Sequence, residues 1–215
     1  MGEKYYFCLN QTVWLMFSLI NTEEMKPVFL TGYMCSGKTT LGRELAAQMG
    51  LRFLDLDEYI ESETGHTINE LFARVGEARF RQMETEALRR VAGMTDVVIS
   101  CGGGTPCHSG NMELMNQLGT TVWLWTSPER IIARLQMPEH RVKRPATAGL
   151  SDEEIAGMVH RSLEQRTAHY AKAKLKFDST RIETAEETVA TAAELAEILR
   201  SESDGRQACD ILQDG

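Results

Sequence analysis

The segment Gly32–Thr39, which reads GYMCSGKT, limits the fold more than any other part of the sequence. It matches the pattern G-x-x-x-x-G-K-[S/T], in which a glycine-rich loop wraps its backbone N–H groups around an anion. The pattern requires a buried strand before it and a helix after it. The apolar run Val28–Thr31 precedes the loop, and the segment Thr39–Met49, with helical periodicity, follows it. The sequence therefore predicts a nucleotide-binding loop in an α/β protein.

The residues of this loop have distinct predicted roles. Lys38 would bridge the β- and γ-phosphates of a nucleotide, and the Thr39 hydroxyl would ligate Mg²⁺. The backbone N–H groups of the loop and of the helix start would point at phosphate oxygens. We expect Cys35, which is larger than glycine, to keep a negative φ. The predicted nucleotide-binding residues of the loop are Cys35, Ser36, Gly37, Lys38, Thr39 and Thr40.

Strands and helices alternate along the rest of the chain. Strands are expected at 53–55, 97–100, 121–125 and 175–178. Helices are expected at 58–64, from a capping box at Thr67, at 77–91, from Pro128, from a cap at Ser151 to about Tyr170, and at 185–199. Nearly continuous apolar strands that alternate with helices are typical of a parallel sheet covered on both faces. We expect one three-layer α/β domain over residues 25–200, with a mostly five-stranded parallel sheet.

Three segments do not fit this pattern. Residues 1–24 contain an apolar run, Val13–Ile20, that is too short to span a bilayer and is followed by no signal-peptide cleavage site, so we expect an N-terminal extension outside the fold. Residues 136–149 have no periodicity and several basic side chains, which predicts a mobile lid. Residues 201–215 are polar and are predicted to be a frayed tail.

The overall charge limits the partners. The chain has 23 Lys and Arg against 31 Asp and Glu, a formal net charge of −8 at pH 7. A surface of this sign does not attract nucleic acid or anionic lipid, so we expect neither nucleic acid nor a membrane as a partner. If the substrate is an anion, the positive charge that binds it must be confined to the substrate pocket. The five cysteines are irregularly spaced and do not suggest a set of disulfide bonds. This favours reduced thiols and a cytoplasmic location.

Two aspartates follow the second predicted strand. The strand Val97–Ser100 ends in Cys101 and glycines, where many ATPases have the carboxylate that supports Mg²⁺, so Asp55 or Asp57 would have to supply it. In an extended segment both side chains point the same way. Asp55 would then support hydrated Mg²⁺, and Asp57 would accept a hydrogen bond from the attacking hydroxyl. The structural alternative is that Asp57 caps the helix at 58–64.

A series of motifs resembles the shikimate kinase family. That family has a phosphate loop, F-x-D-x-D, G-E-x-x-F-R-x-x-E, a glycine triplet after the third strand, R-P in a mobile lid, and R-x-P-x-Y near the end. The corresponding segments here are Gly32–Thr39, Phe53–Asp57, Gly76–Glu84, Gly102–Gly104, Arg144–Pro145 and Arg166–Tyr170. The resemblance extends from about Val28 to Leu199. It departs at Cys35 and Ser36, where Gly-Ala is common, and at Ala168, where proline is usual.

The resemblance implies ATP-dependent phosphorylation of the 3-hydroxyl of shikimate with Mg²⁺, a step of chorismate and aromatic amino-acid biosynthesis. It implies that Arg81 and Arg166 clamp the carboxylate of shikimate and that Glu84 holds the rotamer of Arg81. Asp57 would act as base toward the ring hydroxyl, while Arg144 would close over ATP and stabilise charge on the transferring phosphoryl group. The implied catalytic residues are Lys38, Asp57 and Arg144; the substrate-binding residues are Asp57, Arg81, Gly102, Gly103, Gly104 and Arg166, with Phe72 and Phe80 beside the ring.

Other functions stay open from the sequence. A gluconate kinase is also an acid-sugar kinase with a phosphate loop, but its F-x-D-G-D segment has no glycine counterpart at Leu56. A nucleoside-monophosphate kinase would need contacts to a second base that the sequence does not locate. A regulatory nucleotide-binding module would keep the fold without turnover. We expect a monomer that acts on shikimate and ATP.

Overall fold

The computed structural model describes the chain except for residues 1–23, 139–140, 142–146, 148 and 212–215. Its sheet has five parallel strands in the order β2-β3-β1-β4-β5. The strands are β1 (Val28–Thr31), β2 (Arg52–Asp55), β3 (Val97–Ser100), β4 (Thr120–Trp125) and β5 (Leu175–Asp178). The helices are α2 (Lys38–Met49), α3 (Leu56–Thr64), α4 (Ile68–Val91), η1 (Thr105–Cys107), α5 (Asn111–Leu118), α6 (Pro128–Gln136), α8 (Asp152–Tyr170) and α9 (Ala185–Ile211). The predicted five-stranded parallel sheet is confirmed.

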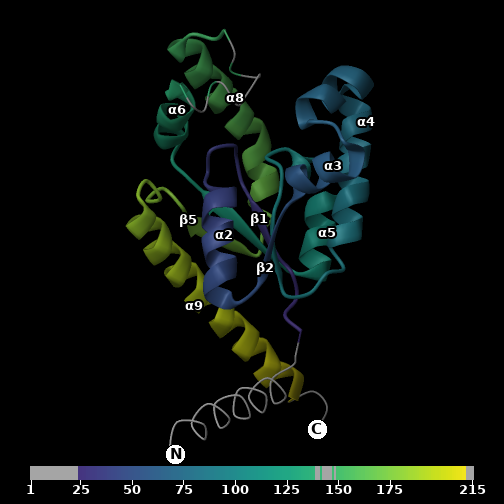
Figure 1. Cartoon of the computed structure of the whole chain (residues 1–215). Coiled ribbons are helices and arrows are strands. Elements are labelled where there is room, and N and C mark those ends of the chain that lie inside the picture. Colours follow the sequence, from purple (N-terminus) through teal and green to yellow (C-terminus); the bar gives the residue numbers. More distant parts are fainter. Residues whose placement is uncertain (1–23, 139–140, 142–146, 148, 212–215) are drawn as a thin grey trace, which may run out of the picture.

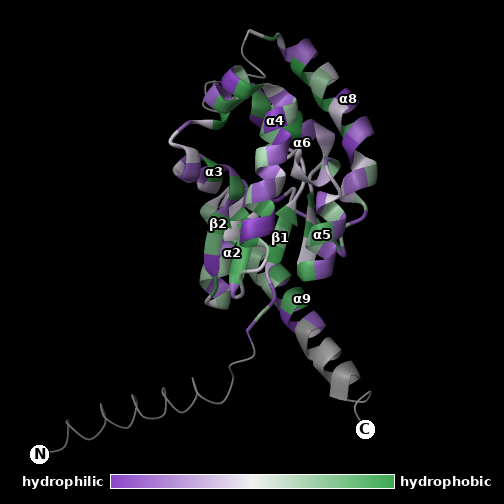
Figure 2. Cartoon of the chain, turned by 90° about the vertical axis from the view of Figure 1, so that its right-hand side faces the viewer, coloured by the Kyte–Doolittle hydropathy of each residue, from purple (hydrophilic) through white to green (hydrophobic). Residues whose placement is uncertain are grey.

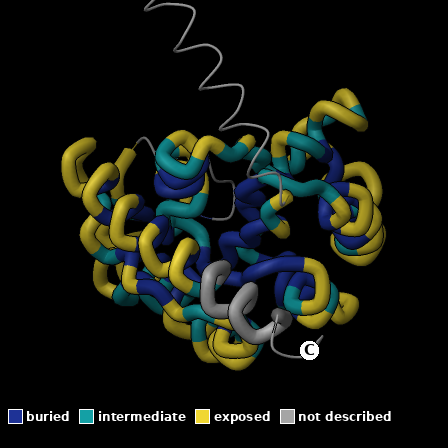
Figure 3. Tube along the Cα trace, turned by 90° about the horizontal axis from the view of Figure 1, so that it is seen from below, coloured by how far each residue is buried: buried dark blue, intermediate teal, exposed yellow. Residues whose placement is uncertain are grey.

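Helices cover both faces of the sheet (Figure 1). Successive residues of β1 point to opposite faces, as the period of a strand requires. Val28 and Leu30 join a core formed with α2 and α9, whereas Phe29 joins a core formed with α3, α4 and α5. Apolar strands therefore lie between helices whose outer surfaces are hydrophilic (Figure 2), and buried residues gather at the centre with exposed ones outside (Figure 3).

The strand order reverses at β1, which lies between β3 and β4. Ligands of α/β sheets bind at such switch points, beyond the carboxyl ends of the strands. Ser100 of β3 is level with Leu30 of β1 on one side and with Asp55 of β2 on the other. The segments that leave these three strands therefore begin side by side. They are the phosphate loop, the aspartate pair and the glycine triplet.

Most predicted helix ends are confirmed. Thr67 makes a full capping box with Glu70, and Ser151 makes another with Glu154. Gly76 has φ 75° and ψ 167° inside α4, so the backbone breaks there into the shorter and the longer helix that were expected. None of the described helices is long and apolar enough to cross a membrane.

Two local predictions are wrong. Helix α3 begins directly after Asp55, so the aspartate pair does not lie in an extended segment. The N-cap is Asp55, whose Oδ1 accepts a hydrogen bond from the Asp57 N–H at 3.1 Å, and Asp57 is therefore not the cap. Helix α9 continues to Ile211, beyond the end predicted for it at Leu199. Each added helical residue needs only one further backbone bond, and no proline follows Leu199 to stop the helix.

Candidate active site

Two adjoining cavities open at the carboxyl edge of the sheet. The first, about 530 Å³, lies against the phosphate loop, and the second, about 880 Å³, lies between α4, the glycine triplet and α8. Both are lined by Met34, Asp57, Gly102 and Gly103. Asp57 therefore stands where the two cavities meet, which is where a group transferred between two ligands would pass.

The phosphate loop leads into a helix start that is open to an anion. Gly37, the N-cap of α2, has φ 88° and makes no side-chain capping bond. The first N–H groups of α2 thus lack a capping side chain, and such groups attract anions together with the helix dipole. Cys35, Gly37, Lys38, Thr39 and Thr40 line the first cavity, whereas Ser36 is fully buried and does not line it.

The expectation that Cys35 keeps a negative φ is wrong, because its φ is 61°. The N–H of Ser36 donates to the carbonyl of Tyr33 at 3.2 Å, which closes a turn with Cys35 at its third position. A type II turn requires a positive φ at that position, and glycine meets the requirement with the least strain. The turn in the loop therefore imposes a positive φ on Cys35, although a residue with a side chain prefers a negative φ.

Lys38 lies folded under the loop. Its Nζ donates to the carbonyls of Gly32 and Tyr33 at 3.0 and 2.8 Å. Desolvation by burial lowers its pKa below the ordinary value of 10.5, while the negative charges of Asp57 and Asp55 act in the opposite direction. The ammonium group is thus held at the loop, beside the cavity that it lines.

The two aspartates differ in their surroundings. Asp55 Oδ2 accepts a hydrogen bond from the Thr39 hydroxyl at 2.8 Å. Desolvation by burial and, to a smaller extent, the negative charges of Asp55 and Glu84 raise the pKa of Asp57 from 3.8 to about 7. Asp57 is therefore suited to exchanging a proton near neutral pH.

The donor set at Thr39 and Asp55 fits Mg²⁺. Both side chains offer hard oxygen atoms, which Mg²⁺ prefers, and the two oxygens lie within hydrogen-bond distance of each other. Among the described residues, no group of three or more His, Cys, Asp or Glu side chains is placed to hold a metal ion. Mg²⁺ in kinase sites is bound by one or two protein oxygens together with substrate phosphates and water, so a small donor set is sufficient.

The second cavity contains a fixed arginine. Arg81 Nη1 pairs with Glu84 Oε2 at 2.9 Å, and Glu84 is 1% exposed. The other oxygen of Glu84 accepts a 2.5 Å hydrogen bond from the Thr105 hydroxyl. Phe72 and Phe80 lie 5.5 and 5.4 Å from the guanidinium carbon of Arg81. The expected contact between Glu84 and Arg81 is confirmed, and the guanidinium is held from several sides.

The glycine triplet makes room for these side chains. A Cβ at Gly104 would lie 2.7 Å from Arg81 Nη2, and one at Gly102 would lie 2.9 Å from Glu84 Oε1. The resemblance implies that the triplet binds the substrate. The structure gives Gly102 and Gly104 a further reason, because any side chain there would displace Arg81 or Glu84.

Arg166 reaches the second cavity from α8. Its guanidinium carbon lies 5.6 Å from the centre of the Tyr33 ring. Near the end of the same helix, the Tyr170 hydroxyl donates to the Gly103 carbonyl at 2.6 Å. The predicted residues Arg81, Arg166 and Asp57 thus line one cavity, while Arg144 lies outside the described residues.

Sequence reasoning missed one end of the first cavity. Arg134, Met137, Ile182 and Glu183 line it beyond the phosphate loop. They come from α6 and from the segment after β5, and no motif marks them. One signal was available for Arg134, because it lies three residues after Ile131 on the apolar face of α6, where a charged residue needs a partner.

The family model for shikimate kinase matches residues 34–197. The chain belongs to the shikimate kinase family. The shikimate kinase of Parabacteroides distasonis is 47% identical over 160 residues, which are 74% of this chain and 91% of that protein. The shikimate kinase of Bacteroides fragilis is 40% identical over 172 residues, which are 80% of this chain and 95% of that protein.

Solved structures of this family share the fold. The crystal structure of shikimate kinase from Bacteroides thetaiotaomicron has a TM-score of 0.79 at 40% identity and covers 82% of this chain and 99% of its own. Shikimate kinase from Acinetobacter baumannii, solved in complex with shikimate, has a TM-score of 0.69 at 30% identity and covers 83% and 94%. The family and the fold class inferred from the sequence are therefore confirmed.

Proposed function

We propose that this shikimate kinase family member transfers the γ-phosphoryl group of ATP to the 3-hydroxyl of shikimate, giving shikimate 3-phosphate and ADP. The observation that carries the proposal is the meeting of the two cavities at Asp57. One cavity has a phosphate loop with Lys38, and the other has two arginines in a chain whose net charge is −8.

In this proposal the first cavity holds ATP. The triphosphate lies over the loop, with Lys38 between the β- and γ-phosphates, and the adenine extends toward Arg134, Met137 and Ile182. Thr39 and Asp55 would hold Mg²⁺, which would neutralise charge on the transferring phosphates. Desolvation of the Lys38 ammonium would be offset when the phosphates bring negative charge to it.

The second cavity holds shikimate in this proposal. The substrate carboxylate pairs with Arg81 and Arg166, and the apolar side of the ring lies on Phe72 and Phe80. The reacting hydroxyl donates its hydrogen bond to Asp57. Its oxygen forms a bond to the γ-phosphorus, the bond from that phosphorus to the β–γ bridging oxygen breaks, and the proton passes to Asp57. A pKa of about 7 leaves much of Asp57 ionised at neutral pH, as a base must be.

Four further parts of the proposal rest on the sequence. Arg144 closes over ATP from the lid during transfer. The protein works as a monomer, and it works in the cytoplasm. Residues 1–24 are an extension that the reaction does not need.

The other functions have less support. The relatives named above are called shikimate kinases, and Leu56 occupies the glycine position of the gluconate kinase motif. The groups that phosphoryl transfer needs from the described residues, Lys38, Thr39, Asp55 and Asp57, all line the first cavity. A regulatory module without turnover does not need all four of these groups in one cavity.

The proposal is tested by an ADP-coupled assay with shikimate, gluconate and AMP as acceptors. We expect shikimate to stimulate ADP formation far more than either alternative. Arg166→Ala should raise the shikimate KM at least about 30-fold. Arg161→Ala, which changes an exposed arginine on the same helix, should leave the KM nearly unchanged. ATP consumption that no acceptor stimulates would contradict the proposal and favour a module without turnover.

A further inference from the structure

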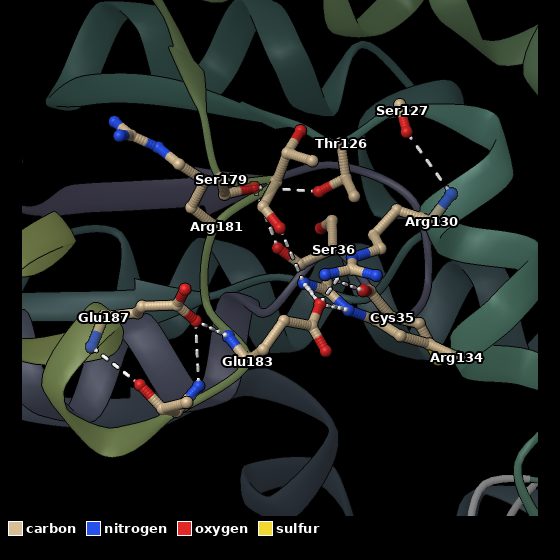
Figure 4. Close-up of polar contacts among 12 residues, drawn as sticks. Cys35, Ser36, Thr126, Ser127, Arg130, Arg134, Ser179, Arg181, Glu183 and Glu187 are labelled. Atoms are coloured by element: carbon tan, nitrogen blue, oxygen red, sulfur yellow. Dashed lines mark hydrogen bonds and ion pairs between the residues drawn. The ribbon is translucent and has the colours of Figure 1, made fainter.

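Two successive carbonyls of the phosphate loop accept hydrogen bonds from side chains of other elements. The Cys35 carbonyl accepts a hydrogen bond from Arg134 Nη1 at 2.8 Å, and the Ser36 carbonyl accepts one from the Ser179 hydroxyl at 3.0 Å. Arg134 comes from α6, and Ser179 directly follows β5, so the two donors approach the loop from different elements (Figure 4). Both donors are buried, with Arg134 7% and Ser179 0% exposed.

Arg134 is itself fixed by several partners. Its Nη2 pairs with Glu183 Oε1 at 2.7 Å and donates to the Thr180 carbonyl at 3.1 Å. Glu183 Oε1 also pairs with Arg130 Nε at 2.9 Å. The guanidinium therefore links α6, the phosphate loop and the segment after β5. Its hydrogen bond to Cys35 lies at the residue whose positive φ costs conformational energy, so it helps to hold a strained turn.

Ser179 has one hydroxyl proton and three oxygen neighbours. These are the Ser36 carbonyl at 3.0 Å, the Trp125 carbonyl at 3.1 Å and the Thr126 hydroxyl at 2.9 Å. The Trp125 carbonyl already accepts the Ser179 N–H at 2.8 Å. If Thr126 donates to Ser179, the single Ser179 proton is free for Ser36, and the buried hydroxyls and carbonyls are then satisfied together.

The bond from Ser179 controls where an N–H group points. In a trans peptide the C=O and the following N–H point in opposite directions. The Ser36 carbonyl shares its peptide with the Gly37 N–H, so holding the carbonyl toward Ser179 directs the Gly37 N–H away from it. Gly37 lines the first cavity. The segment after β5 also closes on this residue, because a Cβ at Gly37 would lie 1.8 Å from Ile182 Cδ1.

We propose that Ser179 is a positioning residue that holds the phosphate loop in its anion-binding form and aims the Gly37 N–H at the nucleotide phosphates. Ser179 touches neither substrate in this proposal and acts only through the loop backbone. The inference rests on the proposed binding of ATP and ADP to the first cavity. It predicts that loss of one buried hydroxyl weakens nucleotide binding without touching the shikimate cavity.

The test compares Ser179→Ala with Thr191→Val in the full chain. Thr191 is also buried, and its hydroxyl donates at 3.1 Å to the Arg181 carbonyl in the same segment after β5. Thr191→Val therefore removes a similar bond from the same segment without touching the phosphate loop. Calorimetric titration with ADP and, separately, with shikimate gives both affinities for each variant, and thermal melts compare their stabilities.

We expect Ser179→Ala to weaken ADP binding about five- to tenfold, the scale of one hydrogen bond. Its shikimate affinity should stay within about twofold of the wild type, and Thr191→Val should bind both ligands normally. Equal ADP affinities of Ser179→Ala and the wild type would overturn the inference. So would an equal loss of ADP affinity in Thr191→Val, or a loss of shikimate binding in Ser179→Ala, because each would point to the fold rather than to the loop. A wild-type chain that binds no ADP would instead contradict the proposed function itself.

Discussion

Replacing Asp57 by Asn should stabilise the protein above neutral pH. The side chain keeps its shape but loses a charge that the site disfavours, since desolvation is the main cause that raises its pKa from 3.8 to about 7. Asp57 is not the N-cap of α3, so the change removes no capping bond from that helix. The gain comes from removing a charge that burial makes costly.

The size and the pH range of this effect follow from linkage. Between about pH 3.8 and about pH 7 the folded protein holds a proton on Asp57 that the unfolded chain has lost, so wild-type stability falls across that range as pH rises. At about 1.36 kcal/mol per pKa unit, the difference corresponds to at most about 4 kcal/mol. Because Asp57 is only partly buried, solvent screening reduces this to about 2 kcal/mol. For a chain of this size that is about 4–8 °C in Tm.

Thermal melts of both proteins at several pH values between 4 and 9 measure the effect. The two Tm values should lie nearest to each other at about pH 4, where the unfolded chain is still partly protonated at Asp57, and diverge to the full difference above about pH 7. At pH 8 the stabilised variant should turn over at least about 100-fold more slowly than the wild type, since it lacks the proposed base. A Tm difference that is independent of pH would refute the burial argument, and a fully active variant would refute the role of Asp57 as base.

Four further outcomes are expected. The wild-type kcat/KM for shikimate should rise through about pH 7 as Asp57 ionises, which a pH–rate profile measures. Arg81→Ala and Arg166→Ala should each raise the shikimate KM at least about 30-fold with ATP binding nearly unchanged, since losing one partner of a buried charge contact costs about 2–5 kcal/mol; normal shikimate binding by both would exclude the assigned substrate. Cys35→Gly should raise Tm or leave it unchanged, because glycine adopts φ 61° without strain, and a clear fall in Tm would show that the side chain contributes more than the strain costs. Deletion of residues 1–24 should leave Tm and turnover nearly unchanged, and a large loss of either would place that segment in the domain.

The fold was predictable because its signals are local. A strand, a phosphate loop and a helix follow one another in the segment Val28–Met49. The helix starts at Thr67 and Ser151 need only a hydroxyl and a glutamate three residues later. Once the strands are parallel, their carboxyl ends share one edge, so motifs far apart in the sequence had to converge there.

The predictions that were wrong depend on single backbone residues. The strand changes to a helix directly after Asp55, rather than a few residues later. The N-cap of α3 is therefore Asp55 and not Asp57. Hydrophobic periodicity does not locate such a boundary to one residue. The positive φ of Cys35 follows from the turn that the loop must make, and nothing in the identity of the residue indicates it.

The contacts that hold the phosphate loop could not be predicted for a different reason. Ser179 and Arg134 act on the carbonyls of Ser36 and Cys35, from positions far away in the sequence. A serine after a strand and an arginine in a helix are compatible with many roles. Their contacts exist only because β5 and α6 end beside the loop, and this depends on the arrangement of the whole sheet.

A chain with a net charge of −8 is proposed to bind anionic ligands. An acidic residue of the site makes this possible, because it stabilises an arginine that would bind one of those ligands. An unpaired buried arginine would be costly before a substrate arrives, and Glu84 reduces that cost for Arg81 while fixing its direction. Glu84 uses its second oxygen for Thr105, so it is satisfied without the substrate. Arg81 lines the second cavity, where the proposed carboxylate would bind, whereas Asp57, whose pKa is raised to about 7, can take a proton near neutral pH. In this arrangement the protein can be acidic overall and still line the second cavity with two arginines and a weak base.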